Sequence, residues 1–261
     1  MLPWLRERFE FKRGGNANNI GPMEGLRGFA VLLVFLVHYE SLLEPWIAKD
    51  IPLLAFANSL HIVGNSGVDL FFLLSGYLIY GSLLSRRQSF LQFFARRLRR
   101  IYPAFTAVFV TYVVLSLLLP SESKIPKDNA ASYLVANYLL LPGLFPIRPM
   151  ITVAWSLSYE MFCYLVLPVM VAFLKLSDRT VGWRLTLFLS ITAAFSAYTA
   201  LNGGPIRLIM FISGMVLYET IKNGELRVSA AVGAIALITG LACTLWPLAG
   251  PVGDTVKVVT S

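Results

Sequence analysis

Charged residues are scarce in this sequence: they make up 14% of its 261 residues, whereas hydrophobic residues make up 57%. A soluble domain carries about 25% charged residues, because its surface must be hydrated. The mean hydropathy of +0.69 and apolar runs that approach the ~20 residues of a spanning helix indicate a membrane protein. The composition therefore argues against soluble, secreted and disordered classes.

Cysteine is scarce too, and the two cysteines, Cys163 and Cys243, both lie within apolar runs. Two such thiols form neither a disulfide framework nor a metal-ligand spacing, so we expect no metal site. The first apolar run carries Glu24, Arg27 and His38, and no small-residue cleavage site follows it. We therefore expect this run to be a retained first span rather than a cleaved signal peptide.

The net charge of +8 comes mainly from short basic clusters that flank the apolar runs. The main clusters are Arg6, Arg8, Lys12 and Arg13, then Arg86 and Arg87, and then Arg96, Arg97, Arg99 and Arg100. Such flanking clusters are typical of the positive-inside bias of membrane proteins, which places the N-terminus and the 85–100 linker in the cytoplasm. No basic stripe is interleaved with stacking aromatic residues, so nucleic acid is not expected as a partner.

The apolar runs predict an all-α fold, a polytopic transmembrane helical bundle of about seven spans. The spans are expected at about 24–47, 66–84, 101–119, 153–175, 184–201, 206–222 and 229–247. Residues 133–146 are too short for a span and are broken by Pro142, Gly143 and Pro146, which favours a re-entrant segment at the outer surface. If that segment does not cross the membrane, the span at about 153–175 runs from the outside to the inside. Lys175 and the basic residues that follow it then lie in the cytosol.

The predicted organisation is a cytosolic basic arm at 1–22, a transmembrane domain at 23–247 and a short polar tail at 248–261. No internal repeat is apparent, so the inverted-repeat signature of many transporters is not seen. Ser75-Gly76 is interpreted as a point of close helix approach rather than as a serine nucleophile.

Ionisable residues within spans are costly, and their default interpretation is functional. Arg27 and His38 are eleven residues apart in one predicted helix, so they point within ~20° of one direction at depths ~16 Å apart. We expect Arg27 near the cytosolic surface and His38 past the midplane. The alternatives are a snorkelling Arg27 paired with Glu24 and an interhelical hydrogen bond of His38. The shared face favours function.

Asp69 and Glu160 are two carboxylates predicted inside spans. Glu160 is about eight residues, or ~12 Å, from the outer end of its span, similar to the expected depth of His38. A carboxylate beside an imidazole fixes its tautomer and stabilises the imidazolium of a general base. The alternatives are an arginine partner for either carboxylate and a helix N-cap for Asp69. His61, predicted in an outer loop, is the reserve candidate for the base.

Several ordered blocks resemble the acyltransferase-3 family, bacterial multi-span enzymes that acylate surface glycans. The blocks are LRGFAVLLVFLVH, GVDLFFLLSGYLI, ARRLRRIYP, WSLSYEMFCYLVLP and RLIMFISGMVLY, in this order between residue 23 and about 222. Their specific elements are the spacing of Arg27 and His38 and the Trp-Ser-Leu-x-x-Glu block. The resemblance implies cytosolic acyl-CoA, commonly acetyl-CoA, as donor and a carbohydrate hydroxyl on the far side as acceptor.

The resemblance also implies that activity depends on Arg27 and His38. It maps the tryptophan–glutamate block to Trp155 and Glu160 and the basic block to Arg97 and Arg100. It further implies a multi-pass protein of the bacterial inner (plasma) membrane that O-acetylates polysaccharide, such as lipopolysaccharide or exopolysaccharide. Family members usually have about ten spans, so this chain is expected to be a short or C-terminally truncated member.

The resulting hypothesis divides the candidate residues into three groups. Donor-binding residues, which hold the CoA phosphates and guide the thioester, are Arg27, Arg96, Arg97, Arg99 and Arg100. The catalytic residues are His38, as base or acyl relay, and its orienting carboxylate, Glu160 or Asp69. The acceptor-binding residues are Arg207 and Trp155, with a snorkelling anchor as the alternative for Arg207.

No tightly bound cofactor is expected, because acyl-CoA is a substrate. The other expected partners are a carbohydrate or lipid-linked glycan acceptor and membrane lipids. A transporter of anionic solutes is the alternative function, with Arg27 and Arg207 as binding sites and His38 as proton relay. An inactive truncated homologue that acts by helix packing is the other alternative.

Overall fold

The computed structural model describes residues 21–43, 52–85 and 89–223. Its helices are α2 (Gly21–Leu43), α3 (Pro52–Ser85), α4 (Phe90–Leu118), α5 (Ala130–Tyr138), α6 (Ala154–Phe173), α7 (Val181–Asn202) and α8 (Ile209–Lys222). Short 3-10 turns occupy Pro120–Glu122, Leu176–Asp178 and Ile206–Leu208. Within the described ranges there is no β-strand, so the predicted all-α class is confirmed there.

Within the part of the chain that the structure describes, four helical stretches are long and apolar enough to cross a membrane. They are His61–Ser85, Phe90–Leu118, Ala154–Phe173 and Val181–Asn202. Each contains or largely overlaps one of the predicted spans. The predicted span at 206–222 is divided between a 3-10 turn and α8, and the one at 229–247 lies outside the described residues, as do residues 1–20 of the arm and the whole tail.

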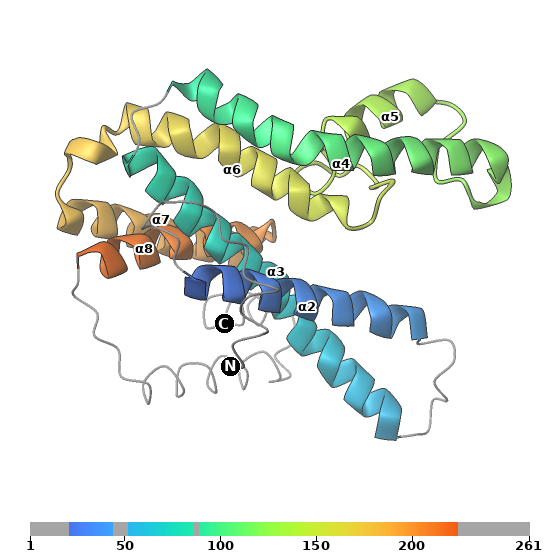
Figure 1. Ribbon diagram of the computed structural model, residues 1–261, viewed down its shortest axis with the longest axis horizontal. Helices are drawn as coiled ribbons and strands as arrows, with labels where there is room; N and C mark the ends of the chain where they lie inside the picture. The colour runs from blue at the N-terminus through green and yellow to red at the C-terminus, as the bar shows by residue number, and fades with distance from the viewer. Residues whose placement is uncertain (1–20, 44–51, 86–88, 224–261) are drawn as a thin grey trace, which may run out of the picture.

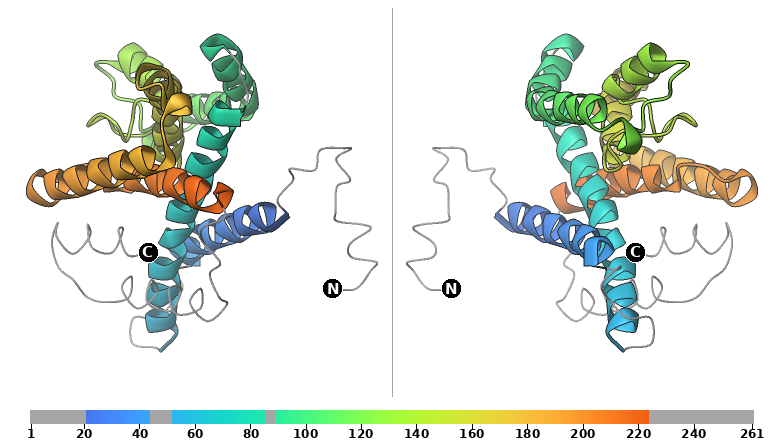
Figure 2. Two further views of the ribbon diagram at one scale, coloured as in Figure 1. Left: turned by 90° about the vertical axis from the view of Figure 1, so that its left-hand side faces the viewer. Right: turned by 90° about the vertical axis from the view of Figure 1, so that its right-hand side faces the viewer.

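Helix α3 is the central element, and its most extensive contacts are with α2 and α8 (Figures 1 and 2). Glycine makes both contacts close. A Cβ atom on Gly67 would lie 2.8 Å from the carbonyl oxygen of Ala30 in α2, and one on Gly76 would lie 2.1 Å from that of Phe211 in α8. The interpretation of Ser75-Gly76 as a close helix approach is therefore confirmed.

The helices divide into an inner and an outer set. In the most apolar stretches of α3 and α6, 44% and 50% of the residues are buried, against 11% in both α4 and α7. Helix α4 lies alongside α6, with α5 next to its second half (Figure 1). Because α4 and α7 keep large apolar side chains exposed, these two helices present the surface that suits contact with lipid.

The predicted starts of two helices are wrong. Both helices begin earlier in the sequence than their apolar runs do. Helix α3 begins at Pro52, so His61 lies within a helix rather than in a loop. Helix α4 begins at Phe90, and its first three turns contain residues that were assigned to the 85–100 linker. A capping box starts this helix, in which the backbone N–H of Gln92 donates to Ser89 Oγ at 3.3 Å. Arginine is a good helix former, so the basic cluster continues the helix.

The segment between α4 and α6 contains the nine-residue α5, which is only ~14 Å long at 1.5 Å per residue. The buried side chain of Asn137 organises the loop that follows, because Met150 N donates to Asn137 Oδ1 at 2.7 Å. At the two ends of the segment, Lys124 Nζ donates to Thr152 Oγ1 at 3.3 Å. The segment thus starts and finishes at one place in the fold.

Candidate active site

Three arginines from two helices gather near one glutamate. Arg27 of α2 lies within electrostatic reach of Arg97 and Arg100 of α4 and of Glu160 of α6. Glu160 is buried, at 7% exposure, whereas Arg100 is exposed. Three guanidinium charges and one carboxylate charge leave this group with a charge of +2, which suits an anionic ligand. We call Arg27, Arg97, Arg100 and Glu160 the arginine–glutamate cluster.

Hydrogen bonds and aromatic rings hold this cluster in place. Glu160 Oε1 accepts a hydrogen bond from Tyr164 Oη, one helical turn later, and a longer one of 3.5 Å from Ser75 Oγ of α3. The guanidinium carbon of Arg97 lies 5.2 Å from the ring centre of Tyr164. That of Arg27 lies 5.9 Å from the ring centre of Phe71. Such cation–π contacts orient the guanidinium groups while leaving hydrogen-bond donors available.

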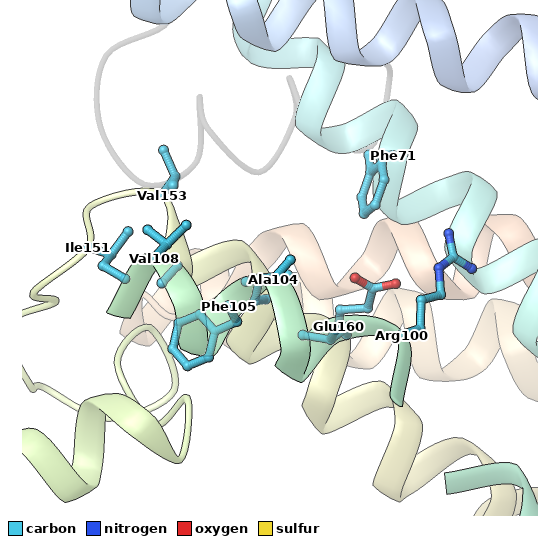
Figure 3. Close-up of a pocket in the computed structure, with 11 residues that line it drawn as sticks. Phe71, Arg100, Ala104, Phe105, Val108, Ile151, Val153 and Glu160 are labelled. Atoms are coloured by element: carbon cyan, nitrogen blue, oxygen red, sulfur yellow. The ribbon is translucent and has the colours of Figure 1, made fainter. Parts of the chain in front are cut away.

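A cavity of about 370 Å³ opens beside the cluster, between α4 and α6. Arg100 and Glu160 line it together with Phe71, and Figure 3 shows the guanidinium and carboxylate groups beside it. The rest of the lining is apolar and follows α4 as far as Val108. This volume is within the range of small-molecule sites. A lining that is charged at one end and apolar elsewhere suits a ligand with an anionic part and a less polar arm.

The structure does not bring His38 together with Glu160, so the predicted pairing is wrong. Helices α2 and α3 are antiparallel: Arg27 lies over Phe71, and Val37 lies against Gly64. Since Glu160 contacts Ser75 of α3, it lies at the Arg27 end of this helix pair. His38 is exposed and ~16 Å further along α2.

The physical reason is that depth was counted from the ends of apolar runs. Such counting assumes parallel axes and a common outer boundary for both helices. Helix α6 instead begins at Ala154, after the loop tied to Asn137, and crosses α3 at the level of Ser75. Its glutamate consequently joins the arginines.

Asp69 pairs with Arg207 rather than with His38. Arg207 Nε lies 3.6 Å from Asp69 Oδ1, and its guanidinium carbon lies 5.4 Å from the ring centre of Trp155. Asp69 is inside α3, so the N-cap alternative is wrong, and the arginine-partner alternative is the one the structure contains. The two predicted acceptor-binding residues, Arg207 and Trp155, are therefore together, and Asp69 joins them.

Helix periodicity divides the four arginines of the basic cluster between two directions. Arg97 and Arg100 are the two that interact with Arg27. Arg99 lines a different groove, and Arg96 is exposed one turn before it on the same face. The donor-binding role predicted for Arg96 and Arg99 stays a prediction.

The acyltransferase domain family matches residues 21–259 of this chain. The chain belongs to this family. The match begins where α2 begins and includes all the helices described above. The resemblance carried by the Arg27–His38 spacing and the Trp155–Glu160 block is thus confirmed at the level of the family.

Three curated relatives illustrate how far the similarity extends. The O-acetyltransferase OatA of Staphylococcus aureus is 29% identical over 166 residues, which cover 58% of this chain and 24% of OatA. The acyltransferase MdmB of Streptomyces mycarofaciens is 27% identical over 243 residues, which cover 83% of this chain and 61% of MdmB. An uncharacterized protein of Haemophilus influenzae is 30% identical over 151 residues, covering 52% of this chain and 61% of that protein. No solved structure matches the chain.

This member of the acyltransferase family also contains a buried ion pair that the sequence analysis missed. Arg184 Nη2 of α7 lies 2.9 Å from Glu219 Oε2 of α8, and Tyr80 Oη of α3 donates to Glu219 Oε1 at 2.5 Å. Glu219 is fully buried. Arg184 is among the basic residues that follow Lys175 and were predicted to be cytosolic, and the acidic residue inside the run MVLYETIK is the signal that could have indicated the pair. Together with Tyr80 the pair joins three helices, and it lies outside the lining of the cavity beside Glu160.

Proposed function

We propose that the chain is a membrane O-acyltransferase that moves an acyl group, in the simplest case acetyl, from acyl-CoA to a hydroxyl of a carbohydrate or glycolipid. One observation carries the proposal: the arginine–glutamate cluster has an excess of positive charge and contributes Arg100 and Glu160 to one end of a cavity whose other lining residues are apolar. Acyl-CoA has the matching form, with phosphates at one end and a thioester arm at the other. The names of the relatives, an O-acetyltransferase and an acyltransferase, support the same reaction.

The donor is proposed to bind from the arginine side. The exposed guanidinium of Arg100 and the ring-stacked guanidinium of Arg97 receive the CoA phosphates through charge-assisted hydrogen bonds. The thioester arm then enters the cavity. The α4 part of its lining runs from Arg100 to Val108, which is ~12 Å along the helix and leads away from the arginines.

The chemical step is a simple exchange of acyl acceptors. The acceptor oxygen attacks the thioester carbonyl carbon, the C–S bond breaks, and CoA leaves as the thiolate. A base removes the hydroxyl proton, and the thiolate is finally protonated to the free thiol. His38 is the proposed base. Helices α2 and α4 run in the same direction (Figure 1), so His38 lies toward the same end of the fold as the Val108 end of the lining, and no described residue of α2 lines the cavity itself. Arg207 and Trp155 are the proposed acceptor contacts, with Asp69 fixing the guanidinium of Arg207.

The membrane orientation is part of this proposal. The basic start of α4 and Arg27 are assigned to the cytosolic side of a bacterial plasma membrane by the positive-inside bias. The N-terminus is then cytoplasmic, and acyl-CoA binds from the cytosol. We retain about seven spans and a re-entrant segment at 133–146.

Arginine substitutions in the cluster are expected to weaken donor binding. Arg97→Gln and Arg100→Gln each remove a charge-assisted hydrogen bond to phosphate, so we expect the Kd for acetyl-CoA to rise about 10- to 100-fold. Arg27→Gln should act in the same direction, and lysine at 97 or 100 should retain part of the affinity as a point charge. The measurement is binding of radiolabelled acetyl-CoA to the purified full chain.

Arg179→Gln is the matched control. Arg179 stacks on Trp183 at 5.0 Å and lies outside the cluster, so its loss lowers the net charge equally without touching the proposed site. An unchanged Kd for acetyl-CoA in all three cluster variants would show that the donor does not bind at this site. Membranes with and without the chain, given radiolabelled acetyl-CoA, then test whether acyl transfer occurs at all.

Because residues 133–146 are proposed to form a re-entrant segment that does not cross the membrane, we expect Ser121 and Thr152 to face the same, outer compartment. The short α5 and the hydrogen bond between Lys124 and Thr152 support this arrangement. The test is single-cysteine labelling, with an impermeant maleimide on intact cells, in a background that lacks Cys163 and Cys243. Both positions should be labelled before lysis. Labelling at 121 alone, with 152 reacting only after lysis, would show that the segment crosses the membrane.

A further inference from the structure

A second hollow lies on another side of α4, apart from the cavity beside Glu160. This groove of about 820 Å³ runs between α4, the end of α5 and α6. Its lining includes Leu98, Arg99, Tyr102 and Thr106 of α4, Tyr138 of α5 and Leu165 of α6. None of these residues lines the cavity of the candidate active site, so the two hollows are separate. We call it the α4–α5 groove.

The α4–α5 groove has an apolar wall whose few hydroxyl groups already have partners. Tyr102 Oη donates to the carbonyl oxygen of Tyr138 at 3.3 Å. Thr106 Oγ1 and Tyr138 Oη share a hydrogen bond of 3.2 Å. Since these polar atoms are engaged with the protein, the ring faces and the side chains of Leu98 and Leu165 are left for a ligand. Such a wall suits a hydrocarbon chain.

Arg99 is the charged side chain of this lining. It is exposed, and among the described residues neither Arg99 nor the adjacent Arg96 forms an ion pair with a carboxylate. A groove with a hydrocarbon-binding wall and an unneutralised guanidinium fits an amphiphile with an anionic head. Basic pockets between membrane helices on the cytosolic side bind anionic lipid headgroups in this way.

Helix α4 is longer than a bilayer core is thick. It has 29 residues, or ~43 Å, against the ~30 Å of the core, so at least one of its ends lies outside the core. The arginines are in the first three turns of the helix, and in the orientation proposed above this start lies on the cytosolic side. From Arg99 to Thr106 is ~10 Å along the axis, which is less than one leaflet of ~15 Å. Tyr138 and Leu139 at the end of α5 also line this part of the groove, so in the proposed orientation the re-entrant segment enters from the outer side and its tip reaches the cytosolic half of α4.

We propose that the α4–α5 groove binds an anionic phospholipid of the cytosolic leaflet, with its phosphodiester on Arg99 and one acyl chain along α4 toward Thr106. The proposal rests on the membrane orientation given above and is independent of acyl transfer. The cytosolic leaflet is rich in anionic lipids, so the ligand is abundant where the site opens. The two pairs of arginines on α4 then have different ligands, because they lie on different faces of one helix.

The test is native mass spectrometry of the purified full chain in non-ionic detergent, with equal amounts of phosphatidylglycerol and phosphatidylcholine. We expect preferential retention of phosphatidylglycerol. Arg99→Gln should reduce that retention about fivefold, the contribution of one basic residue at an anionic surface, and Arg99→Lys should keep most of it. Leu165→Trp should reduce retention of both lipids by filling the groove. Arg179→Gln is the control that lowers the charge elsewhere.

A photoactivatable phosphatidylglycerol, with the reactive group in its acyl chain, provides a second measurement on the unmodified protein. Crosslinked peptides should contain residues 94–106 or the end of α5. Equal retention of the two lipids, crosslinks confined to other helices, or unchanged retention in both groove variants would overturn the proposal. Displacement of phosphatidylglycerol by palmitoyl-CoA but not by acetyl-CoA would assign the groove to the chain of a long acyl donor instead. Glycerol phosphate, which has the head but no chain, should not compete.

Discussion

Replacing Glu160 by glutamine is expected to lower kcat for acyl transfer by about 100-fold or more, without raising the KM for acetyl-CoA. Glutamine keeps the shape of the side chain but removes its charge. The positive charges of Arg27, Arg97 and Arg100 would then repel one another, because the negative carboxylate that lies among them is gone. In other active sites, removing one preorganised polar group that stabilises the transition state costs about 10²- to 10³-fold in kcat. Anion binding does not weaken, because the site becomes more positive.

The split between kcat and KM separates this role from donor binding, since the cluster arginines should raise KM. Rates are measured as release of the CoA thiol by the purified chain at several acetyl-CoA concentrations. Ser75→Ala is the matched control, because it removes only the longer 3.5 Å hydrogen bond to the same carboxylate and should cost less than about tenfold. A Glu160→Gln variant with the kcat of the unmodified chain would show that catalysis does not depend on the carboxylate among the cluster arginines.

The membrane class could be predicted from the sequence because it depends on composition and on the length of apolar runs. Both properties reflect the solvent around each helix and need no knowledge of neighbours. The apolar runs around Phe72, Phe109, Cys163 and Phe188 accordingly form helices that are long enough to span, four in number among the described residues. The ends of α4 could not be predicted in this way, since its first three turns are basic and are held in the helix by capping at Ser89.

The division of the four arginines of the basic cluster between two helix faces could have been predicted from the sequence. Arg97 and Arg100 are three residues apart, as are Arg96 and Arg99, so a helix puts each pair on one face. The prediction treated all four as one group because it started the helix at 101 rather than at 90. The ring contacts of Arg97 with Phe93 and Tyr164 follow once this turn is helical.

The ion pairs between helices could not be predicted from the sequence. The Arg184–Glu219 pair joins residues 35 positions apart, and Asp69 meets Arg207 from the other half of the chain. Which charges meet depends on the tilt and neighbours of each helix, and these follow from the glycine contacts of α3 rather than from the apolar runs. The predicted partner of His38 was wrong for the same reason.

Replacing His38 by alanine is expected to reduce acyl transfer by about 100-fold or more, the usual contribution of a general base, while expression and membrane insertion stay normal. His38 is exposed on α2, so alanine leaves no cavity in the protein, and a loss of rate reports on chemistry rather than on folding. The KM for acetyl-CoA should change less than about twofold, because the imidazole lies ~16 Å along the helix from Arg27.

His61→Ala is the comparison, since it removes the second histidine of the chain, which lies within α3. Thiol release and labelled product are measured for both variants, with and without added imidazole. Free imidazole should restore part of the rate of His38→Ala, because a missing base can be replaced from solution, whereas a purely structural defect cannot. Full activity of His38→Ala together with an inactive His61→Ala would move the base to His61 and would change the route by which the acyl group leaves the arginine–glutamate cluster.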